Sequence, residues 1–157
     1  MLRRATADDV EFLADAWYAM LEEDRLLAPR VDPQWRSYIT ADFRTGISGG
    51  SQLWIVAEEE RRIVATGAAF FRGGRSSLAL TGLTATLAGV YTFPGFRRRG
   101  LARAVVGRLI ELCRTRGCRF VRLRASEQGR PLYEQLGFVP GDEMVLPLYP
   151  SNWAECT

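Results

Sequence analysis

The sequence predicts a single α/β (α+β) domain in which helices cover both faces of one mixed β-sheet. Its 157 residues match the usual length of one domain with a sizeable core. Stretches with helical apolar spacing are interleaved with short runs rich in β-branched residues, in the order β-α-α-β-β-β-α-β-α-β. No repeat, linker or low-complexity tract interrupts them, so we expect residues 1–157 to form one domain.

The first third of the chain predicts one strand and two helices. Residues 2–5 are a short strand candidate. Thr6 is a suitable helix N-cap, and Asp9 three positions later completes a capping box. Apolar residues at helical spacing follow, namely Val10, Leu13, Ala14, Trp17, Met20 and Leu21. This helix is expected to reach about residue 21, and a second one to run from near residue 33 to residue 45.

The middle of the chain predicts antiparallel strands. Two apolar runs, Gln52–Ala57 and Ile63–Phe71, flank a short charged turn, which is the pattern of a hairpin. Residues 78–92 are expected to supply one or two further strands. Pro94 stops them, because proline cannot donate a hydrogen bond to a sheet ladder.

The clearest helix in the sequence opens at Gly100 and stops at Gly117. One apolar stripe runs along it, formed by Leu101, Val105, Leu109, Leu112 and Cys113. Residues 118–125 then predict a strand, and Ser126 is a good N-cap for a short helix. Residues 138–148 are expected to return as a last strand or pair of strands.

All 21 basic side chains are arginines, and the chain has neither lysine nor histidine. The absence of histidine excludes Ser-His-Asp and Cys-His nucleophile pairs and imidazole bases. The absence of lysine excludes a Walker P-loop and Schiff-base catalysis. A codon bias toward arginine is the alternative to a functional reason for this composition. In either case the chemistry must use carboxylates, hydroxyls, thiols, arginine and backbone N–H groups.

The net charge of +3 hides an uneven distribution of charge along the chain. Residues 1–60 carry twelve acidic side chains and six arginines, whereas residues 97–130 carry eleven arginines and two glutamates. The basic segment is therefore where an anionic partner is expected. Alternatively, most of these arginines lie on a solvated helix face and at exposed strand ends and bind no partner.

Nothing in the sequence predicts a membrane, secreted or metal-bound protein. No apolar signal segment follows the N-terminus, so we expect a cytoplasmic location. The longest uncharged stretch, residues 76–96, contains threonines, glycines and a proline, which favour buried strands over a membrane span. The cysteines are Cys113, Cys118 and Cys156. Because they are odd in number and lack CxxC spacing, neither a disulfide framework nor a metal site is expected.

Residues 89–103 carry the clearest chemical signal. A strand ends at Pro94, three arginines follow, and a helix opens at Gly100. The start of a helix presents unpaired N–H groups and the positive end of its dipole, so it binds phosphate without side chains. Gly100 lets a phosphate approach the backbone closely, and the arginines add positive charge. The segment therefore predicts a pyrophosphate site.

This arrangement resembles the acetyl-CoA-binding motif of the GNAT (GCN5-related) superfamily of N-acetyltransferases. The motif is Arg/Gln-x-x-Gly-x-Gly/Ala, which Arg97, Gly100 and Ala102 match. Residues 126–138 are similar to the family's second motif, which ends in Leu-Tyr-x-x-x-Gly-Phe, and Tyr133 matches its tyrosine. Two motifs in the right order are more specific than either one alone. The resemblance implies the acyl-CoA N-acyltransferase (GNAT) fold.

The resemblance also implies that acetyl-CoA is the cosubstrate, bound in a gap between two diverging strands. Backbone groups of Val90, Tyr91 and Thr92 are then expected to bind the pantetheine arm. Ser126 and Gly129 are expected to line the same arm. The pyrophosphate is expected at the first motif, on Arg97, Arg98, Arg99, Gly100, Leu101, Ala102 and Arg103.

In such enzymes the acceptor amine attacks the thioester directly, which needs neither an enzyme nucleophile nor a metal. Tyr133, which also contacts the cosubstrate, is expected to protonate the departing thiolate. The strand that leads to Val90 has no carboxylate, although many relatives have a glutamate there that helps deprotonate the amine. The base then comes from Glu58, Glu59 or Glu60, from the acidic end of the first helix or from ordered water, or no particular group acts as a base.

The resemblance further implies that the acceptor lies near the loop that joins the first two helices. Candidates for its recognition are Glu22, Glu23, Asp24 and Arg30. A small amine, an antibiotic, a peptide N-terminus and a protein lysine all remain open as acceptors, and a homodimer is common in the family. Two alternatives from other classes are a non-catalytic acyl-CoA-binding sensor or partner module of the same fold, and an arginine-rich nucleic-acid binder. No helix-turn-helix or single-strand-binding pattern supports a nucleic-acid partner.

Overall fold

The computed structural model describes residues 1–27, 31–73 and 82–141. Its strands are β1 (Leu2–Arg4), β2 (Gln52–Glu59), β3 (Arg62–Arg72), β4 (Thr84–Thr92) and β5 (Val121–Leu123). Its helices are α1 (Val10–Glu23), α2 (Trp35–Gly49), α3 (Leu101–Thr115) and α4 (Arg130–Gln135). Two short 3-10 helices, Ala7–Asp9 and Pro94–Phe96, precede α1 and α3.

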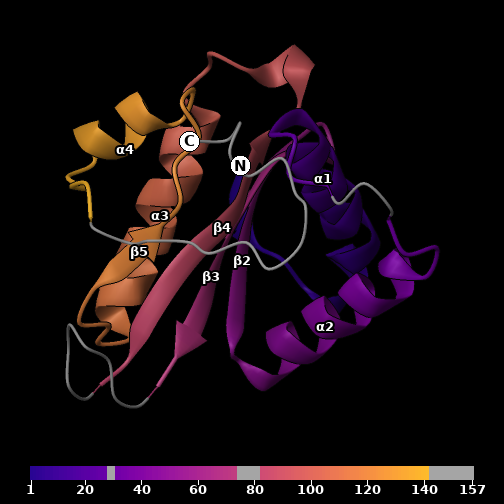
Figure 1. Cartoon of the computed structure of the whole chain (residues 1–157), viewed down its shortest axis with the longest axis horizontal. Coiled ribbons are helices and arrows are strands. Elements are labelled where there is room, and N and C mark those ends of the chain that lie inside the picture. The colour runs from indigo at the N-terminus through magenta and orange to yellow at the C-terminus, as the bar shows by residue number, and fades with distance from the viewer. Residues whose placement is uncertain (28–30, 74–81, 142–157) are drawn as a thin grey trace.

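The five strands form one sheet in the order β1-β2-β3-β4-β5, with α1 and α2 on one face and α3 and α4 on the other (Figure 1). The first three strand pairings are antiparallel, and the pairing of β4 with β5 is parallel. The mixed sheet with helices on both faces, predicted from the sequence, is therefore confirmed.

The N-terminal elements follow the predicted order but differ at their ends. Thr6 and Asp9 form the expected capping box, in which the Asp9 carboxylate accepts a hydrogen bond from the Thr6 backbone N–H at 2.8 Å. Helix α1 ends at Glu23 rather than near residue 21, and α2 continues to Gly49 rather than ending at residue 45. Gly50 ends α2 because it adopts a left-handed φ of 75°, which glycine tolerates.

The strand predicted over residues 118–125 is shorter in the structure. Its first residue completes the end of α3 instead, since the Cys118 N–H donates to the Cys113 carbonyl at 3.0 Å. Only Val121–Leu123 then pair with β4.

The expected Ser126 cap also differs from the prediction. Helix α4 begins only at Arg130, with Pro131 in its first turn. Ser126 closes the preceding turn, where its hydroxyl oxygen accepts a hydrogen bond from the Gly129 N–H at 3.2 Å. Residues 138–141 form no strand. Parts of two predicted strands lie outside the described residues, namely 78–81 and 142–148.

The pairing of β3 with β4 contains a β-bulge, in which Gly67 faces both Gly89 and Val90. Gly89 has a φ of 62°, and a Cβ there would lie 2.9 Å from the ring of Trp54. A Cβ on Gly67 would lie 2.6 Å from the Val105 side chain of α3. Glycine is therefore needed at both positions for close packing, and at Gly89 for its backbone conformation as well.

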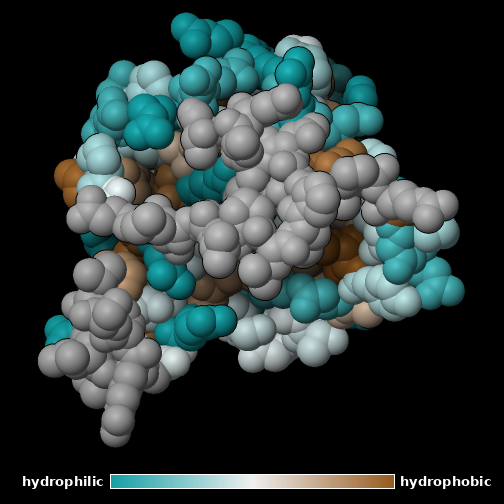
Figure 2. Space-filling view, viewed as in Figure 1, coloured by the Kyte–Doolittle hydropathy of each residue, from teal (hydrophilic) through white to brown (hydrophobic). Residues whose placement is uncertain are grey.

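Two apolar cores lie on the two faces of the sheet. On one face α3 packs through Val105 and Leu109. On the other face Leu13 of α1 and Phe43 of α2 pack against Trp54. On the side of the molecule shown in Figure 2, small separate hydrophobic areas lie among mostly hydrophilic side chains. None of the helices formed by the described residues combines the length and the apolar character that a membrane span needs.

Candidate functional site

One end of the sheet gathers the segments that the sequence singled out. The C-terminal end of β4, the start of α3, the end of α1 and helix α4 lie at this end of the molecule (Figure 1). Side-chain hydrogen bonds connect the arginines around the start of α3 to neighbouring elements, from Arg97 to Glu23 of α1, from Arg99 to Glu59 of β2 and from Arg103 to Gln135 of α4. The basic segment thus lies beside acidic residues that are far from it in the sequence.

Strand β4 extends beyond its neighbour β5. The two strands pair only as far as Leu87 and Leu123, whereas β4 continues to Thr92. The β5 side of residues 88–92 therefore has no strand beside it among the described residues. Backbone groups on such an edge are able to bind an extended ligand as an added strand. The three residues expected to bind pantetheine all lie in this stretch, namely Val90, Tyr91 and Thr92.

The loop before α3 and the first turn of α3 offer a run of unpaired backbone donors. Gly100 opens the helix with a φ of 78°, and the first helical hydrogen bond runs from the Ala104 N–H to the Gly100 carbonyl at 3.0 Å. The N–H groups of residues 98–103 have no acceptor among the described residues. A Cβ on Gly100 would meet no atom within 4 Å, so the space beside it is open. This arrangement has the donors and the room that a diphosphate needs. The donors belong to Arg98, Arg99, Gly100, Leu101, Ala102 and Arg103.

The side chain of Arg97 binds Glu23 at the end of α1. Its two terminal nitrogens donate to the Glu23 carboxylate at 2.8 and 2.6 Å. Its Nε donates to the Thr92 carbonyl at 2.8 Å, and the guanidinium lies 5.5 Å from the centre of the Tyr91 ring. The resemblance placed Arg97 at the pyrophosphate, but in the structure its guanidinium is occupied by Glu23. This ion pair joins the loop before α3 to the end of α1. Nothing in the sequence indicates that these two segments lie close together.

The other arginines of this segment differ from one another. Arg99 donates to Glu59 at 3.0 Å, and its guanidinium lies 5.7 Å from the centre of the Phe96 ring. Arg98 has a left-handed φ of 62°, and its side chain makes no ion pair with any described residue. Arg103 donates to a side chain of α4. Within the described structure, Arg98 is therefore the loop arginine whose side chain is available to a phosphate.

Tyr133 lies on α4 and is 9% exposed. A Cβ on Gly129 would lie 3.0 Å from the Tyr133 ring and 3.3 Å from the Ser126 hydroxyl oxygen, so these three residues are close neighbours. The Phe138 ring also packs against Tyr133, with the ring centres 5.9 Å apart. Burial raises the pKa of Tyr133, and the charge of Asp24 raises it further. The hydroxyl group therefore stays protonated at neutral pH.

Asp24 is the C-cap residue of α1 and is half-buried. Burial raises its pKa, the neighbouring carboxylate of Glu23 raises it further, and Arg124 opposes both effects. Because its charge also acts on Tyr133, the end of α1 and helix α4 share one electrostatic environment. Sequence reasoning named Asp24 as an acceptor candidate but missed its relation to Tyr133 and Arg124, which no spacing pattern indicates. Arg30 lies outside the described residues.

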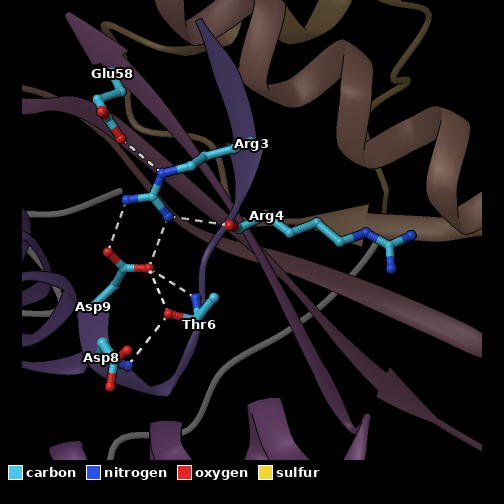
Figure 3. A network of polar contacts seen from close by, with 6 residues as sticks. All are labelled: Arg3, Arg4, Thr6, Asp8, Asp9 and Glu58. Atoms are coloured by element: carbon cyan, nitrogen blue, oxygen red, sulfur yellow. Dashed lines mark hydrogen bonds and ion pairs between the residues drawn. The ribbon is translucent and has the colours of Figure 1, made fainter. Parts of the chain in front are cut away.

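The carboxylates of the β2–β3 hairpin, considered as bases, are held in different ways. Glu58 accepts a hydrogen bond from the Arg3 Nε at 2.7 Å, and Arg3 also donates to both oxygens of Asp9 at 2.9 Å (Figure 3). Glu59 is paired with the loop before α3, and Glu60 occupies the exposed turn with a φ of 47°. Glu58 thus belongs to a network that joins β1, β2 and the start of α1, and β4 itself carries no carboxylate.

The two described cysteines are not poised as nucleophiles. Burial raises the pKa of Cys113 to about 12, and burial also raises the pKa of Cys118, so both remain thiols at neutral pH. Cys156 lies outside the described residues. Within the described ranges, no group of three or more Cys, Asp or Glu side chains gathers as metal ligands would.

Comparison with known structures identifies proteins that share this fold. A predicted acetyltransferase from Clostridium acetobutylicum, crystallised with acetyl-CoA, is similar with a TM-score of 0.83 and 26% identity, over 94% of both chains. A GCN5-related N-acetyltransferase from Ralstonia eutropha JMP134 is similar with a TM-score of 0.78 and 26% identity, over 94% of this chain and 97% of that one.

Sequence comparisons agree with the structural ones. The glucosamine 6-phosphate N-acetyltransferase of Trypanosoma brucei brucei is 38% identical over 69 residues, which make up 44% of this chain. This chain thus aligns with 42% of the length of that curated relative. The profile described as the acetyltransferase (GNAT) family matches residues 14–138. The enzyme class predicted from the sequence, an acetyl-CoA-dependent N-acetyltransferase, is the class of this family. Because the match spans both motifs and most of the sheet, the chain belongs to the GNAT family of acetyltransferases.

Proposed function

We propose that this protein transfers the acetyl group of acetyl-CoA to a primary amine. The observation that carries the proposal is the run of unpaired N–H groups over residues 98–103, close to a β4 edge without a neighbouring strand. A diphosphate and an extended, amide-containing arm have the chemistry that these two features recognise. Membership of the family and a similar protein crystallised with acetyl-CoA support this choice of cosubstrate.

In the proposed reaction, the amine nitrogen attacks the carbonyl carbon of the thioester, whose oxygen is polarised by a backbone N–H of residues 90–92. A C–N bond forms, the C–S bond breaks, and the CoA thiolate leaves with the bonding electron pair. The nitrogen loses one proton and the thiolate gains one, so the products are an N-acetylated amine and CoA with a free thiol. No enzyme nucleophile is needed, which suits a chain without histidine and lysine.

Tyr133 is the proposed proton donor to the CoA thiolate. Its raised pKa keeps the phenol protonated before the reaction, and its burial beside Gly129 limits competition from water. The proton that the amine nitrogen loses replaces the one that Tyr133 donates. A positioned general acid of this kind contributes about 10²–10⁴-fold to a rate.

A cationic amine is the proposed class of acceptor. The half-buried carboxylate of Asp24 lies at the end of α1 and its charge raises the pKa of Tyr133, so it is the proposed contact for an ammonium group of the acceptor. Glu22 adds a second negative charge at the exposed end of α1. The amine of glucosamine 6-phosphate, named for the trypanosomal relative, belongs among the acceptors to be tested.

A two-step experiment tests the proposal. The melting temperature is measured at physiological salt with and without acetyl-CoA, and free thiol is then followed while amines are added. The panel contains a polyamine, free amino acids, an aminoglycoside, a peptide N-terminus, a lysine peptide and glucosamine 6-phosphate. We expect a raised melting temperature and thiol release with at least one amine. Tyr133→Phe is expected to lose most of the release while keeping the thermal shift.

The same experiment separates the second candidate, a non-catalytic acyl-CoA-binding sensor of this fold. The absence of a carboxylate on β4 is the observation that favours this candidate. A thermal shift without thiol release for any amine would support the sensor. The absence of any shift with acetyl-CoA would contradict both candidates. Tight binding to nucleic acid that weakens steeply with salt would indicate an arginine-rich nucleic-acid binder instead.

A further inference from the structure

Arg97 joins three parts of the candidate site through one side chain. Glu23, the last residue of α1, lies 74 positions away in the sequence and accepts two hydrogen bonds from the guanidinium. Thr92, the last residue of β4, accepts a third hydrogen bond from the Arg97 Nε. Arg97 itself directly precedes the run of backbone donors over residues 98–103. Arg97 therefore holds the end of α1, the end of β4 and residues 98–103 in one arrangement.

The contacts of Arg97 leave little room for a direct role in phosphate binding. All three guanidinium nitrogens donate to protein oxygens, two of them in a bidentate contact with the Glu23 carboxylate. A phosphate would have to displace this carboxylate before it could bind the side chain. The backbone N–H groups of residues 98–103 have no such competitor among the described residues.

The ion pair is also poorly placed to stabilise the fold. The side chains of Arg97 and Glu23 are 29% and 39% exposed, and exposed ion pairs contribute little to stability. Helix α1 is already held on the sheet by fully buried residues such as Val10 and Leu13. The Arg97–Glu23 contact therefore contributes little to the stability of the fold, but it joins the loop before α3 to the end of α1. A contact of this kind is suited to coupling the motions of the two segments.

We propose that Arg97 is a positioning residue that couples residues 98–103 to the end of α1, which carries the proposed acceptor contact Asp24. The proposal rests on the proposed function, in which residues 98–103 bind the pyrophosphate of CoA. When CoA binds, residues 98–103 become less mobile. Through the Arg97 contact, Glu23 and the adjacent Asp24 become less mobile as well. Bound CoA thereby reduces the mobility of the acceptor side of the site.

Hydrogen exchange of the full chain, measured by mass spectrometry with CoA as the probe, tests this coupling. In the wild-type protein we expect CoA to slow exchange in a peptide that covers residues 20–27, by about threefold or more. Arg97→Gln and Glu23→Gln are each expected to abolish this slowing while the Kd for CoA stays within about threefold of wild type. The double variant is expected to behave like either single variant, because all three lack the same contact.

A matched control is available on α3. Arg108 and Glu111 form an exposed ion pair at 2.9 Å, so Arg108→Gln removes the same charge from a pair of the same kind. This variant is expected to keep the CoA-dependent slowing in residues 20–27. A purely structural role of Arg97 would raise exchange in this peptide by the same factor with and without CoA, and the ratio would stay at its wild-type value.

Three results would overturn the coupling. In the first, CoA binds the wild-type protein without slowing exchange in residues 20–27. In the second, Arg97→Gln retains the slowing. In the third, Arg97→Gln weakens CoA binding by more than about tenfold while Glu23→Gln leaves it unchanged or tighter, as expected of a phosphate ligand released from its carboxylate. Failure of the wild-type protein to bind CoA at all would instead contradict the proposed function, and the coupling with it.

Discussion

The hydroxyl of Thr66 donates a hydrogen bond to the carbonyl of Gly89 at 2.8 Å, in the buried interior of the β3–β4 pairing. The bulge opposite Gly67 interrupts the regular ladder at this point, and Thr66 provides the Gly89 carbonyl with a partner. The bulge comes just after Leu87, where the pairing of β4 with β5 ends. Thr66 therefore stabilises the irregularity next to the edge on which the pantetheine is proposed to bind.

Replacing Thr66 with valine tests this relationship. The side chain keeps its shape, but the buried carbonyl of Gly89 loses its donor, which is expected to cost about 1–3 kcal/mol of unfolding free energy. Urea unfolding of the two proteins measures the difference. Thr66→Ser retains the hydroxyl and is expected to lose less stability than the valine variant. Equal stability of Thr66→Val and wild type would show that this hydrogen bond does not support the bulge.

Tyr133→Phe is expected to lower kcat about 100-fold, because the proposed general acid is removed. The affinity for acetyl-CoA is expected to stay near the wild-type value, since the ring still packs against Gly129 and Phe138. Steady-state kinetics and calorimetry measure the two quantities. Tyr38→Phe is the control, because Tyr38 is 59% exposed on α2, and it is expected to leave kcat unchanged. An unchanged kcat in Tyr133→Phe would contradict the acid role.

The pH dependence of kcat provides a second test of Tyr133. Burial raises its pKa above the ordinary tyrosine value of about 10, so the acid stays protonated throughout the mildly alkaline range. Loss of the Tyr133 proton is therefore expected to lower kcat only above about pH 10. A falling limb near pH 8 that disappears in Tyr133→Phe would show that this pKa is lowered instead.

Asp24→Asn is expected to raise the melting temperature at pH 7. Burial raises the folded-state pKa of Asp24 above its unfolded value of about 3.9, so the ionised carboxylate opposes folding at neutral pH. This penalty fades as the pH falls through the folded-state pKa, and the gain of the variant is expected to shrink toward about pH 4. Scanning calorimetry across this range measures the effect. Asp15→Asn, on the exposed face of α1 in a pair with Arg36, is expected to bring no such gain.

The same Asp24 variant is expected to lose recognition of a cationic amine. Loss of the carboxylate is expected to lower kcat/KM for that amine about tenfold or more, with the affinity for acetyl-CoA unchanged. Steady-state kinetics with the best amine of the panel measure the loss. A lower melting temperature at pH 7 together with unchanged kinetics would contradict both expectations for Asp24.

Asp9→Asn is expected to have the opposite dependence on pH. Arg3 donates to both oxygens of Asp9 and holds its pKa below the unfolded value of about 3.9. The ionised group therefore contributes stability above about pH 4, and this contribution is lost as the pH falls through the folded-state pKa. At pH 7 the variant is expected to lose about 1–3 kcal/mol. Acid titration of the unfolding free energy measures the gap between the variant and wild type. A gap that stays constant down to about pH 2 would contradict this role of the pair.

The parts of the fold that depend on neighbouring residues were predictable from the sequence. The Thr6 capping box, the β2–β3 hairpin and the helix that opens at Gly100 each follow from residue types within a few positions of one another. The order of the two motifs then predicted which strand and which helices form the candidate site. Tyr133 and residues 98–103 were named on this basis.

The features that depend on distant residues were not predictable. The bidentate contact of Arg97 with Glu23 spans 74 positions, and charge patterning indicates only that opposite charges are present. The bulge at Gly89 depends on the register between β3 and β4, and the length of β5 depends on where its pairing with β4 ends. The relation of Asp24 to Tyr133 likewise results from the packing of α1 and α4 at one end of the sheet. Tertiary contacts decide each of these.

Backbone amide NMR of the 157-residue protein, titrated with acetyl-CoA, tests most directly whether the start of α3 binds the cosubstrate. We expect the amide protons of Gly100, Leu101 and Ala102 to shift downfield as they donate to phosphate oxygens. The amides of residues 90–92 are expected to shift as well, as the pantetheine arm pairs with β4. If acetyl-CoA saturates the protein while these signals stay in place and others move, the cosubstrate binds elsewhere and the proposed site is wrong.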